Sequence, residues 1–345
     1  NGTIRLKGNE TLTNIANLDT DSGTVTYYGD NGGGGSPFTI YDFGTTDYYN
    51  LTFDATSGTD VFRPTDTLTI ANNLTITQGT FDNATNNKNI NVTGNVTMDN
   101  TQTNMGNATW TVSGDFDNQD VGTFYKNTGT LVMNGGTEAS PVNLTMKHIG
   151  NLLHHLTVSG YTTIPSSSGQ YNSVYGILTV SGTLNITSGK ILQNLYSAGD
   201  VRVTSTGRIT GEGRLQAGVA GAKLTQKDGI IDVATFGIVS PGSNTTIVPA
   251  TYESANVVIS NGSSVPALWK PSAGTYTFNG NVTLYGGSVD TRTITLDNSV
   301  NNPNFVFKGN LTINNSTGAV IWQKGTGTIT VGGTSTQSLN FLGKT

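Results

Sequence analysis

The chain has 345 residues, of which 34% are hydrophobic and 11% charged, with no Cys and a net charge of −5. So few basic groups exclude a nucleic-acid-binding face, which needs dense Lys and Arg, and no run of about 18 apolar residues predicts a membrane span. Thr, Asn, Gly and Ser number 58, 38, 45 and 26, nearly half of the residues. This neutral, hydroxyl-rich composition favours an extracellular or cell-surface protein.

Short segments of alternating apolar and polar residues recur along the chain and predict strands. They include residues 67–70, 74–76, 90–92, 96–98, 110–112 and 178–180, each bounded by Gly, Asn, Asp or Ser. We find no convincing helical period of 3.6 residues among the apolar positions. The sequence therefore predicts an all-β protein.

A recurring pattern joins two such strands through a glycine. It reads Ile90-Asn-Val-Thr-Gly-Asn-Val-Thr-Met98 in one place and Phe305-Val-Phe-Lys-Gly-Asn-Leu-Thr-Ile313 in another. Partial copies centre on Gly8, Gly114, Gly182 and Gly280. Because glycine accepts positive φ without penalty, we interpret it here as the residue of a bend.

A longer repeat of roughly 100 residues contains these patterns. Its approximate units are 1–44 (partial), 45–150, 151–265 and 266–345, within one continuous array over 1–345. The two ends of the chain fall at the same position within this repeat, because Ile4–Asn9 matches Phe305–Asn310. We expect a parallel β-solenoid with irregular coils, the alternative being tandem β-sandwich domains. Residues 201–265 depart from the pattern and are expected to bulge or carry an insertion.

The segments Tyr48–Phe53, Asn73–Phe81 and Gly129–Gly136 carry a resemblance to a known class. They resemble the β-strand-repeat cell-surface proteins of uncultivated bacteria and archaea. More loosely, they are similar to adhesins, autotransporter passengers, and surface-layer or sheath proteins. The resemblance implies a β-solenoid with a structural or adhesive role outside the cell, and it supplies no catalytic residues.

Asn-X-Ser/Thr motifs are frequent and make glycosylation a hypothesis. The candidate acceptors are Asn50, Asn73, Asn91, Asn95, Asn143, Asn185, Asn281 and Asn310. In all eight the middle residue is Leu, Val or Ile, so the alternation of a strand produces the motif without any glycan. Both explanations stay open.

Two acidic turns have the alternating carboxylates that suit calcium. The candidate ligands are Asp19 and Asp21 in the first turn, and Asp115, Asp117 and Asp120 in the second. The first turn lacks the Gly and Glu of an EF-hand, and turn capping is the alternative. We expect no other cofactor.

Residues suited to catalysis are few. Because neighbouring strand residues point to opposite faces, His154 and His155 are not expected to share a metal, and His148 stands apart. Arg and acidic residues gather within 202–228, where we favour surface stacking over a site. We expect no enzyme, and a carbohydrate-active β-helix enzyme is the least favoured alternative.

The first and last coils look like interior coils rather than polar caps, which indicates assembly through unprotected strand edges. The candidate assembly residues are Ile4, Leu6, Leu12, Tyr27, Tyr28, Ile329, Val331, Leu339 and Phe341. We predict a secreted structural homopolymer forming a filament, sheath or surface layer. A segment of a longer array would show the same ends, and the functional alternative is an adhesin stalk that binds cell-surface glycans.

Overall fold

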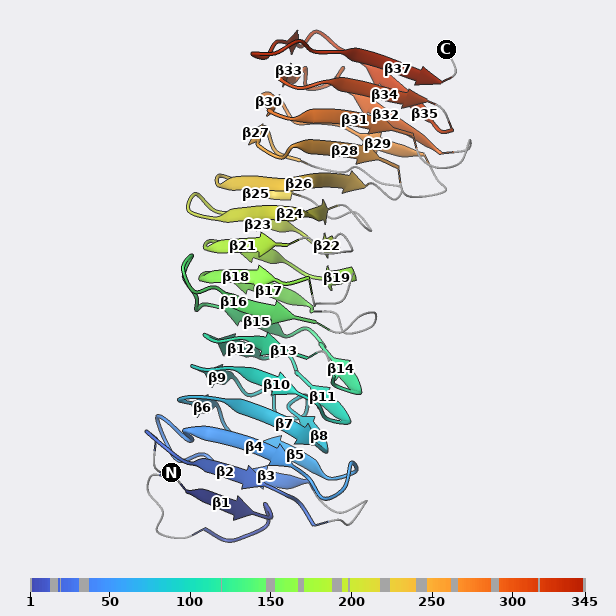
Figure 1. Ribbon diagram of the computed structural model, residues 1–345. Coiled ribbons are helices and arrows are strands. Elements are labelled where there is room, and N and C mark those ends of the chain that lie inside the picture. The colour runs from blue at the N-terminus through green and yellow to red at the C-terminus, as the bar shows by residue number, and fades with distance from the viewer. Residues whose placement is uncertain are drawn as a thin grey trace. The chain divides into compact units, whose positions relative to one another are not determined.

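The computed structural model describes residues 2–12, 18, 20–30, 37–118, 120–146, 153–166, 171–187, 194–197, 199–217, 224–239, 247–261, 266–286, 292–315 and 317–343. The chain divides into two compact units, unit 1 (Asn1–Asn172) and unit 2 (Ser173–Thr345). No described residue is helical. The predicted all-β class is confirmed (Figure 1).

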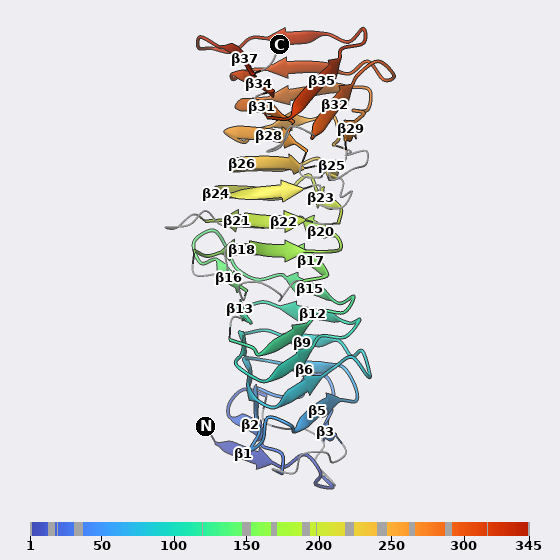
Figure 2. The same cartoon turned by 90° about the vertical axis from the view of Figure 1, so that its right-hand side faces the viewer.

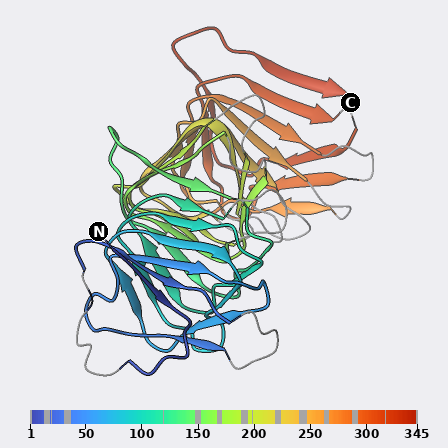
Figure 3. The same ribbon diagram turned by 60° about the horizontal axis from the view of Figure 1, so that its bottom comes forward.

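Unit 1 is built from coils whose strands stack into three parallel sheets. The first sheet contains, in paired order, β1 (Thr3–Leu6), β2 (Thr24–Tyr27), β4 (Asn50–Asp54), β7 (Leu74–Gln78), β10 (Val96–Met98), β13 (Phe116–Asp117), β16 (Val142–Thr145) and β18 (Tyr161–Ile164). The second contains β3 (Phe38–Ile40), β5 (Val61–Pro64), β8 (Thr80–Asp82), β11 (Gln102–Asn104) and β14 (Thr123–Tyr125). The third contains β6 (Leu68–Ile70), β9 (Ile90–Val92), β12 (Thr109–Val112), β15 (Thr130–Met133) and β17 (His155–Val158). Figure 3 turns the first coils of this unit toward the viewer.

Unit 2 repeats the same construction. Its first sheet contains β21 (Thr183–Ile186), β24 (Arg208–Ala217), β26 (Ile230–Val239), β28 (Asn256–Ser260), β31 (Asn281–Tyr285), β34 (Leu311–Asn315) and β37 (Leu339–Gly343), which lie above one another in Figure 2. β22 (Asn194–Ser197) pairs with the second half of β24, and β19 (Tyr171–Val174) spans the residue boundary between the units.

Three smaller parallel sheets complete unit 2. They contain β20 (Leu178–Val180), β23 (Val201–Val203) and β25 (Leu224–Lys227); β27 (Thr251–Tyr252), β30 (Thr275–Phe278), β33 (Asn304–Phe307) and β36 (Ile329–Val331); and β29 (Ala267–Trp269), β32 (Thr293–Asp297) and β35 (Ala319–Gln323). Every strand pair between described residues is parallel, as a stacked solenoid requires. Tandem antiparallel sandwiches are thereby excluded.

The core consists of columns in which one inward position repeats from coil to coil. Leu51, Leu74 and Val96 occupy the same register position in β4, β7 and β10, and all three are fully buried. Aromatic rings stack in the same way in unit 2, where Tyr252 and Phe278 have ring centroids 5.3 Å apart. Because each column is continuous, a coil at which the stack stops loses the apolar contacts that a neighbouring coil would make on that side.

The pattern glycines do not all have the expected role: Gly8 has the positive φ of a bend, 103°, whereas most of the others do not. Gly94 lies between β9 and β10, as predicted, but its φ is not positive. A Cβ there would lie 2.6 Å from both the Asn72 carbonyl oxygen and Asn73 Oδ1. Gly114 stands against Gly94 of the preceding coil in the same way. The interpretation as a positive-φ bend is therefore wrong at these positions, where close stacking of backbones requires glycine.

The departure expected after residue 201 takes the form of two long strands. β24 and β26 have 10 residues each, and their pairing shifts register between Gly211 and Arg214. A second shift interrupts the pairing of β23 with β25. The repeat units of about 100 residues stay a prediction.

Candidate functional site

β1 lies at the start of the first sheet of unit 1. Among the strand pairs that the structure describes, β1 pairs with β2 alone, with Ile4 opposite Val25 and Leu6 opposite Tyr27. The side chain of Leu6 is buried, whereas that of Ile4 is 50% exposed. Leu12 is half-buried beyond the strand. Ile4 thus continues the buried column of Val25 and Leu51 but has no described neighbour on its outer side.

A shallow hollow adjoins this coil. Ile4, Leu18, Val25, Tyr49 and Asn50 line it together with small polar residues at the start of β1 and β2. An adjoining hollow adds the carboxylate of Asp21. The surface beside β1 therefore mixes apolar side chains with hydroxyl and amide groups.

The last coil of unit 2 is the counterpart. Within the described part of the chain, β37 pairs only with β34, placing Leu339 opposite Leu311 and Phe341 opposite Ile313. Leu339 and Val331 are 51% and 44% exposed, although the residues beneath them, Leu311 and Phe307, are buried. Ile329 is half-buried above Phe305, and the side chain of Phe341 lies outside the described part.

The two tyrosines among the assembly candidates have different surroundings. Tyr27 is fully buried, and its hydroxyl lies 3.0 Å from that of Tyr48. Burial raises the pKa of Tyr27 to about 12, so the phenol stays neutral. Tyr28 is half-buried, with the guanidinium carbon of Arg5 5.3 Å from its ring centroid. Of the two, only Tyr28 offers surface to a second molecule.

Most of the sequon asparagines have a structural role that the sequence analysis missed. The Oδ1 atoms of Asn50, Asn73 and Asn95 accept hydrogen bonds from the backbone nitrogens of Asn73, Asn95 and Asp115 at 3.2, 2.9 and 2.8 Å. Asp115 Oδ1 accepts from the nitrogen of Asn143 at 2.7 Å. In unit 2, Asn281 and Asn310 bond in this way to the nitrogens of Asn310 and Ser338 at 3.0 and 2.8 Å. We call these two series the asparagine ladders.

Each ladder residue immediately precedes an inward apolar residue of the first sheet. Its side-chain oxygen accepts a hydrogen bond from the equivalent backbone N–H of the next coil and so fixes the register of that coil. The signal in the sequence was Asn directly after the pattern glycine, as in Gly94-Asn95. Asn91 and Asn185 stand elsewhere, on β9 and β21, and are half-buried. Glycosylation at the eight positions stays a prediction.

The calcium candidates are not gathered into one site. Asp19 lies outside the described residues, and Asp21 and Asp120 are exposed. Asp115 belongs to the ladder of unit 1, and Asp117 is half-buried on β13. Within the described ranges, no group of three or more His, Asp or Glu is placed to hold a metal ion. Calcium binding at these residues stays a prediction.

Two of the histidines lie together. The rings of His154 and His155 are 4.4 Å apart between centroids and nearly perpendicular. Because β17 begins only at His155, the alternation of a strand does not yet apply to His154, and the expected separation onto opposite faces is wrong. Burial, with smaller contributions from His155 and Lys126, lowers the pKa of His154. His148 lies outside the described residues.

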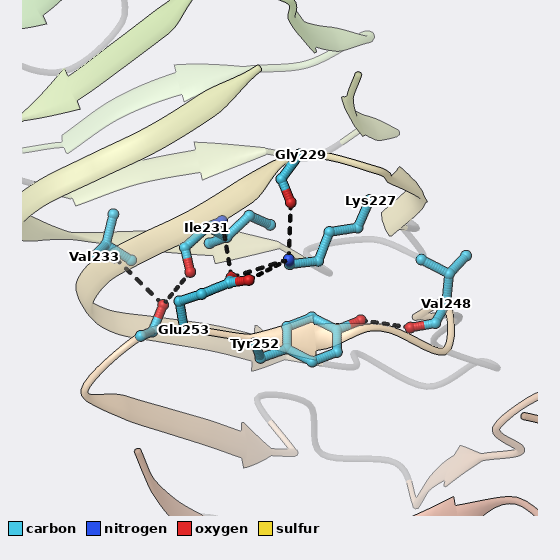
Figure 4. Close-up of polar contacts among 8 residues, drawn as sticks. Lys227, Gly229, Ile231, Val233, Val248, Tyr252 and Glu253 are labelled. Atoms are coloured by element: carbon cyan, nitrogen blue, oxygen red, sulfur yellow. Dashed lines mark hydrogen bonds and ion pairs between the residues drawn. The ribbon is translucent and has the colours of Figure 1, made fainter. Parts of the chain in front are cut away.

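In the charged stretch 202–228, Lys227 is a buried cation. Lys227 is 8% exposed, and its Nζ donates to the Gly229 carbonyl at 3.0 Å and lies 3.0 Å from Glu253 Oε2 (Figure 4). The same Nζ lies 5.4 Å from the ring centroid of Tyr252. Arg202 and Arg208 are exposed. Lys227 therefore joins β25 to the coil that contains β27, which is a structural arrangement.

Two buried carboxylates lie in unit 1. Asp47 is fully buried and accepts hydrogen bonds from the nitrogens of Phe43 at 2.8 Å and Thr69 at 2.6 Å. Burial raises its pKa to about 6. Asp60 is 3% exposed, and neither of its carboxylate oxygens has a hydrogen-bond partner. Asp60 Oδ2 lies against Gly29, where a Cβ would come within 2.2 Å of it.

Comparison with protein-family models, with curated proteins and with solved structures finds no match for the chain. Within the described residues, no helix is long and apolar enough to cross a membrane.

Proposed function

We propose that this is a secreted structural protein whose copies join end to end into an extracellular filament, sheath or surface layer. The observation that carries the proposal is the exposure of Ile4 and Leu339, 50% and 51%, at positions that are buried in the neighbouring coils. Both side chains continue apolar columns, and both belong to strands with one described partner. Strand edges of this kind template the addition of another strand.

The two edges are complementary because all described pairing is parallel. In such a stack every strand has one edge toward the preceding coil and one toward the following coil. Within the described residues, β1 has no strand paired on the side of the preceding coil and β37 has none on the side of the following coil. Joining β37 of one copy to β1 of the next is a heterologous contact, and repetition of such a contact produces open polymers.

The test is electron microscopy and sedimentation of the purified protein with three single variants. Ile4→Asp and Leu339→Asp each place a charge at one end of an apolar column and should abolish polymers. Val300→Asp is the matched control, because Val300 is 64% exposed in a turn rather than on an edge strand. It should polymerise like the wild type.

A mixture of the two edge variants sharpens the result. Ile4→Asp keeps an intact β37 and Leu339→Asp keeps an intact β1, so the mixture should stop at heterodimers. Wild-type protein that stays monomeric at high concentration would overturn the proposal, and glycan-array binding by that monomer would favour the adhesin alternative. Parallel samples with calcium and with a chelator test the aspartates of the acidic turns.

A further inference from the structure

The asparagine ladder of unit 2 ends on a residue whose partner position is empty within the described chain. Ser338 donates its backbone N–H to Asn310 Oδ1 at 2.8 Å, and its carbonyl accepts from the nitrogen of Leu311 at 3.0 Å. The interior coil of unit 1 shows the same two bonds. There Asn73 donates to Asn50 Oδ1 at 3.2 Å and accepts from the nitrogen of Leu51 at 3.0 Å. β37 is thus attached as an ordinary interior coil.

The corresponding position at the other end is Thr3. Thr3 lies opposite Thr24 in the register of β1 with β2, and Thr24 lies opposite Asn50 in that of β2 with β4. Asn50 is the first residue of the ladder of unit 1. Thr3 and Ser338 therefore occupy equivalent positions, each one residue before the exposed apolar residue, Ile4 or Leu339, of its strand.

We infer that the junction between copies has a defined register, in which Ser338 of one copy faces Thr3 of a second copy. Leu339 then lies opposite Ile4, Asn340 opposite Arg5, and Phe341 opposite Leu6. The nitrogen of Leu339 donates to the carbonyl of Thr3, as that of Leu311 does to Ser338. This inference rests on the proposed function and adds the partner strand and its register.

The occupant is a second copy of this chain because one molecule carries both halves of the junction. The edges of β1 and β37 that have no described partner face in the opposite directions that parallel addition needs. The apolar columns meet inward residue to inward residue only when Leu339 is opposite Ile4, since a shift by one residue reverses every side chain. Alternation thus selects this register over its nearest neighbours.

Engineered cysteines test the register directly, because the chain has no Cys of its own. Arg5 and Asn340 are exposed and would be neighbours across the junction. In-register residues of adjacent strands lie about 4.8 Å apart, within the Cα separation that a disulfide spans. Oxidation of Arg5→Cys/Asn340→Cys polymers should give ladders of covalent oligomers, whereas either single variant has no partner Cys at the junction and should not crosslink there.

A second pair of engineered cysteines distinguishes the addition of β37 beside β1 from the replacement of β1 by β37. Thr26 lies opposite Arg5 in unit 1. If β37 displaced β1 from β2, Asn340→Cys would crosslink to Thr26→Cys instead. That result, with polymers intact, would overturn the inference and leave the proposed function standing. Absence of polymers under every condition would remove the proposed function first and the inference with it.

The ladder also predicts a gain of function. Ser338→Asn supplies the carboxamide that the interior ladder residues have, so its Oδ1 can accept from the nitrogen of Thr3 in the second copy. One such hydrogen bond should lower the critical concentration for assembly about fivefold. Ser335→Asn, also exposed in the last coil, is the control and should leave that concentration unchanged. Equal behaviour of both variants would contradict the proposed register.

Discussion

Asn73 Oδ1 accepts a hydrogen bond from the backbone nitrogen of Asn95 at 2.9 Å, across the gap between two consecutive coils. A side chain of one coil is thereby hydrogen-bonded to the backbone of the next. Asn95 Oδ1 in turn accepts a hydrogen bond from the backbone nitrogen of Asp115 in the following coil. Coils of uneven length can stack in register because the ladder sets the register at the same point of each coil that it joins. The loops between strands can then vary without disturbing the core.

Replacing Asn73 with Ala should destabilise unit 1 by about 1 kcal/mol, the usual net value of one hydrogen bond. Urea denaturation followed by circular dichroism measures the change. Asn91→Ala is the matched control, since Asn91 belongs to a sequon but not to the ladder, and it should stay within about 0.5 kcal/mol of the wild type. Equal losses for both variants would show that the ladder contributes nothing specific.

Gly94→Ala should destabilise unit 1 by about 2 kcal/mol through overpacking. The added Cβ would meet the Asn72 carbonyl oxygen and Asn73 Oδ1 at 2.6 Å, so two coils would have to separate. Gly2→Ala serves as the comparison, because nothing lies within 4 Å of a Cβ there. The midpoint of thermal unfolding should be lower for Gly94→Ala than for Gly2→Ala. An unchanged midpoint for Gly94→Ala would refute the packing argument.

Lys227→Met should destabilise unit 2 by about 2 to 4 kcal/mol, because it removes one partner of a mostly buried ion pair. The side chain of Glu253 is 26% exposed and keeps its contact with the nitrogen of Ile231, which moderates the loss. Lys227→Met/Glu253→Leu removes both charges and should recover part of the stability. A double variant no more stable than the single one would argue against an uncompensated charge as the cause.

The stability of unit 1 should fall as pH rises from about 4 to above 6. Burial raises the folded pKa of Asp47 to about 6, whereas the unfolded value is about 4, so the folded state binds the proton more tightly. The contribution is complete below the unfolded pKa, is lost as pH passes the folded pKa, and is at most about 3 kcal/mol. Urea titrations between pH 4 and 7 measure it. Asp47→Asn, although less stable overall, should lack this component of the slope.

Asp60→Asn should raise the free energy of unfolding of unit 1 by about 1 to 3 kcal/mol. A buried carboxylate without a hydrogen-bond donor is costly, and a neutral side chain of the same shape costs less. Asp99→Asn is the control and should have little effect, because Asp99 is exposed one residue beyond the end of β10. Loss of stability in Asp60→Asn would indicate that the carboxylate has a favourable role.

The sheets show where sequence similarity and spatial position diverge. Ile4–Asn9 matches Phe305–Asn310 in sequence. Yet β1 pairs with β2 in the first sheet of unit 1, whereas β33 pairs with β30 and β36 in a different sheet of unit 2. A short apolar-x-apolar-x-Gly-Asn pattern fits any side of a coil, so local similarity alone does not assign a strand to a sheet.

The sequence by itself determined the all-β class and favoured stacked parallel coils over tandem sandwiches, because short strands with period-two alternation recur along the chain and are interrupted by glycine. The tertiary structure alone decided which sequon asparagines form ladders, why Gly94 must be glycine, that Tyr27 is buried and that the carboxylate of Asp60 has no hydrogen-bond partner. Each of these depends on what lies one coil away, about 20 to 30 residues distant in the chain. The register between coils depends on residues that are far apart in the sequence, so the alternation within a single strand does not predict it.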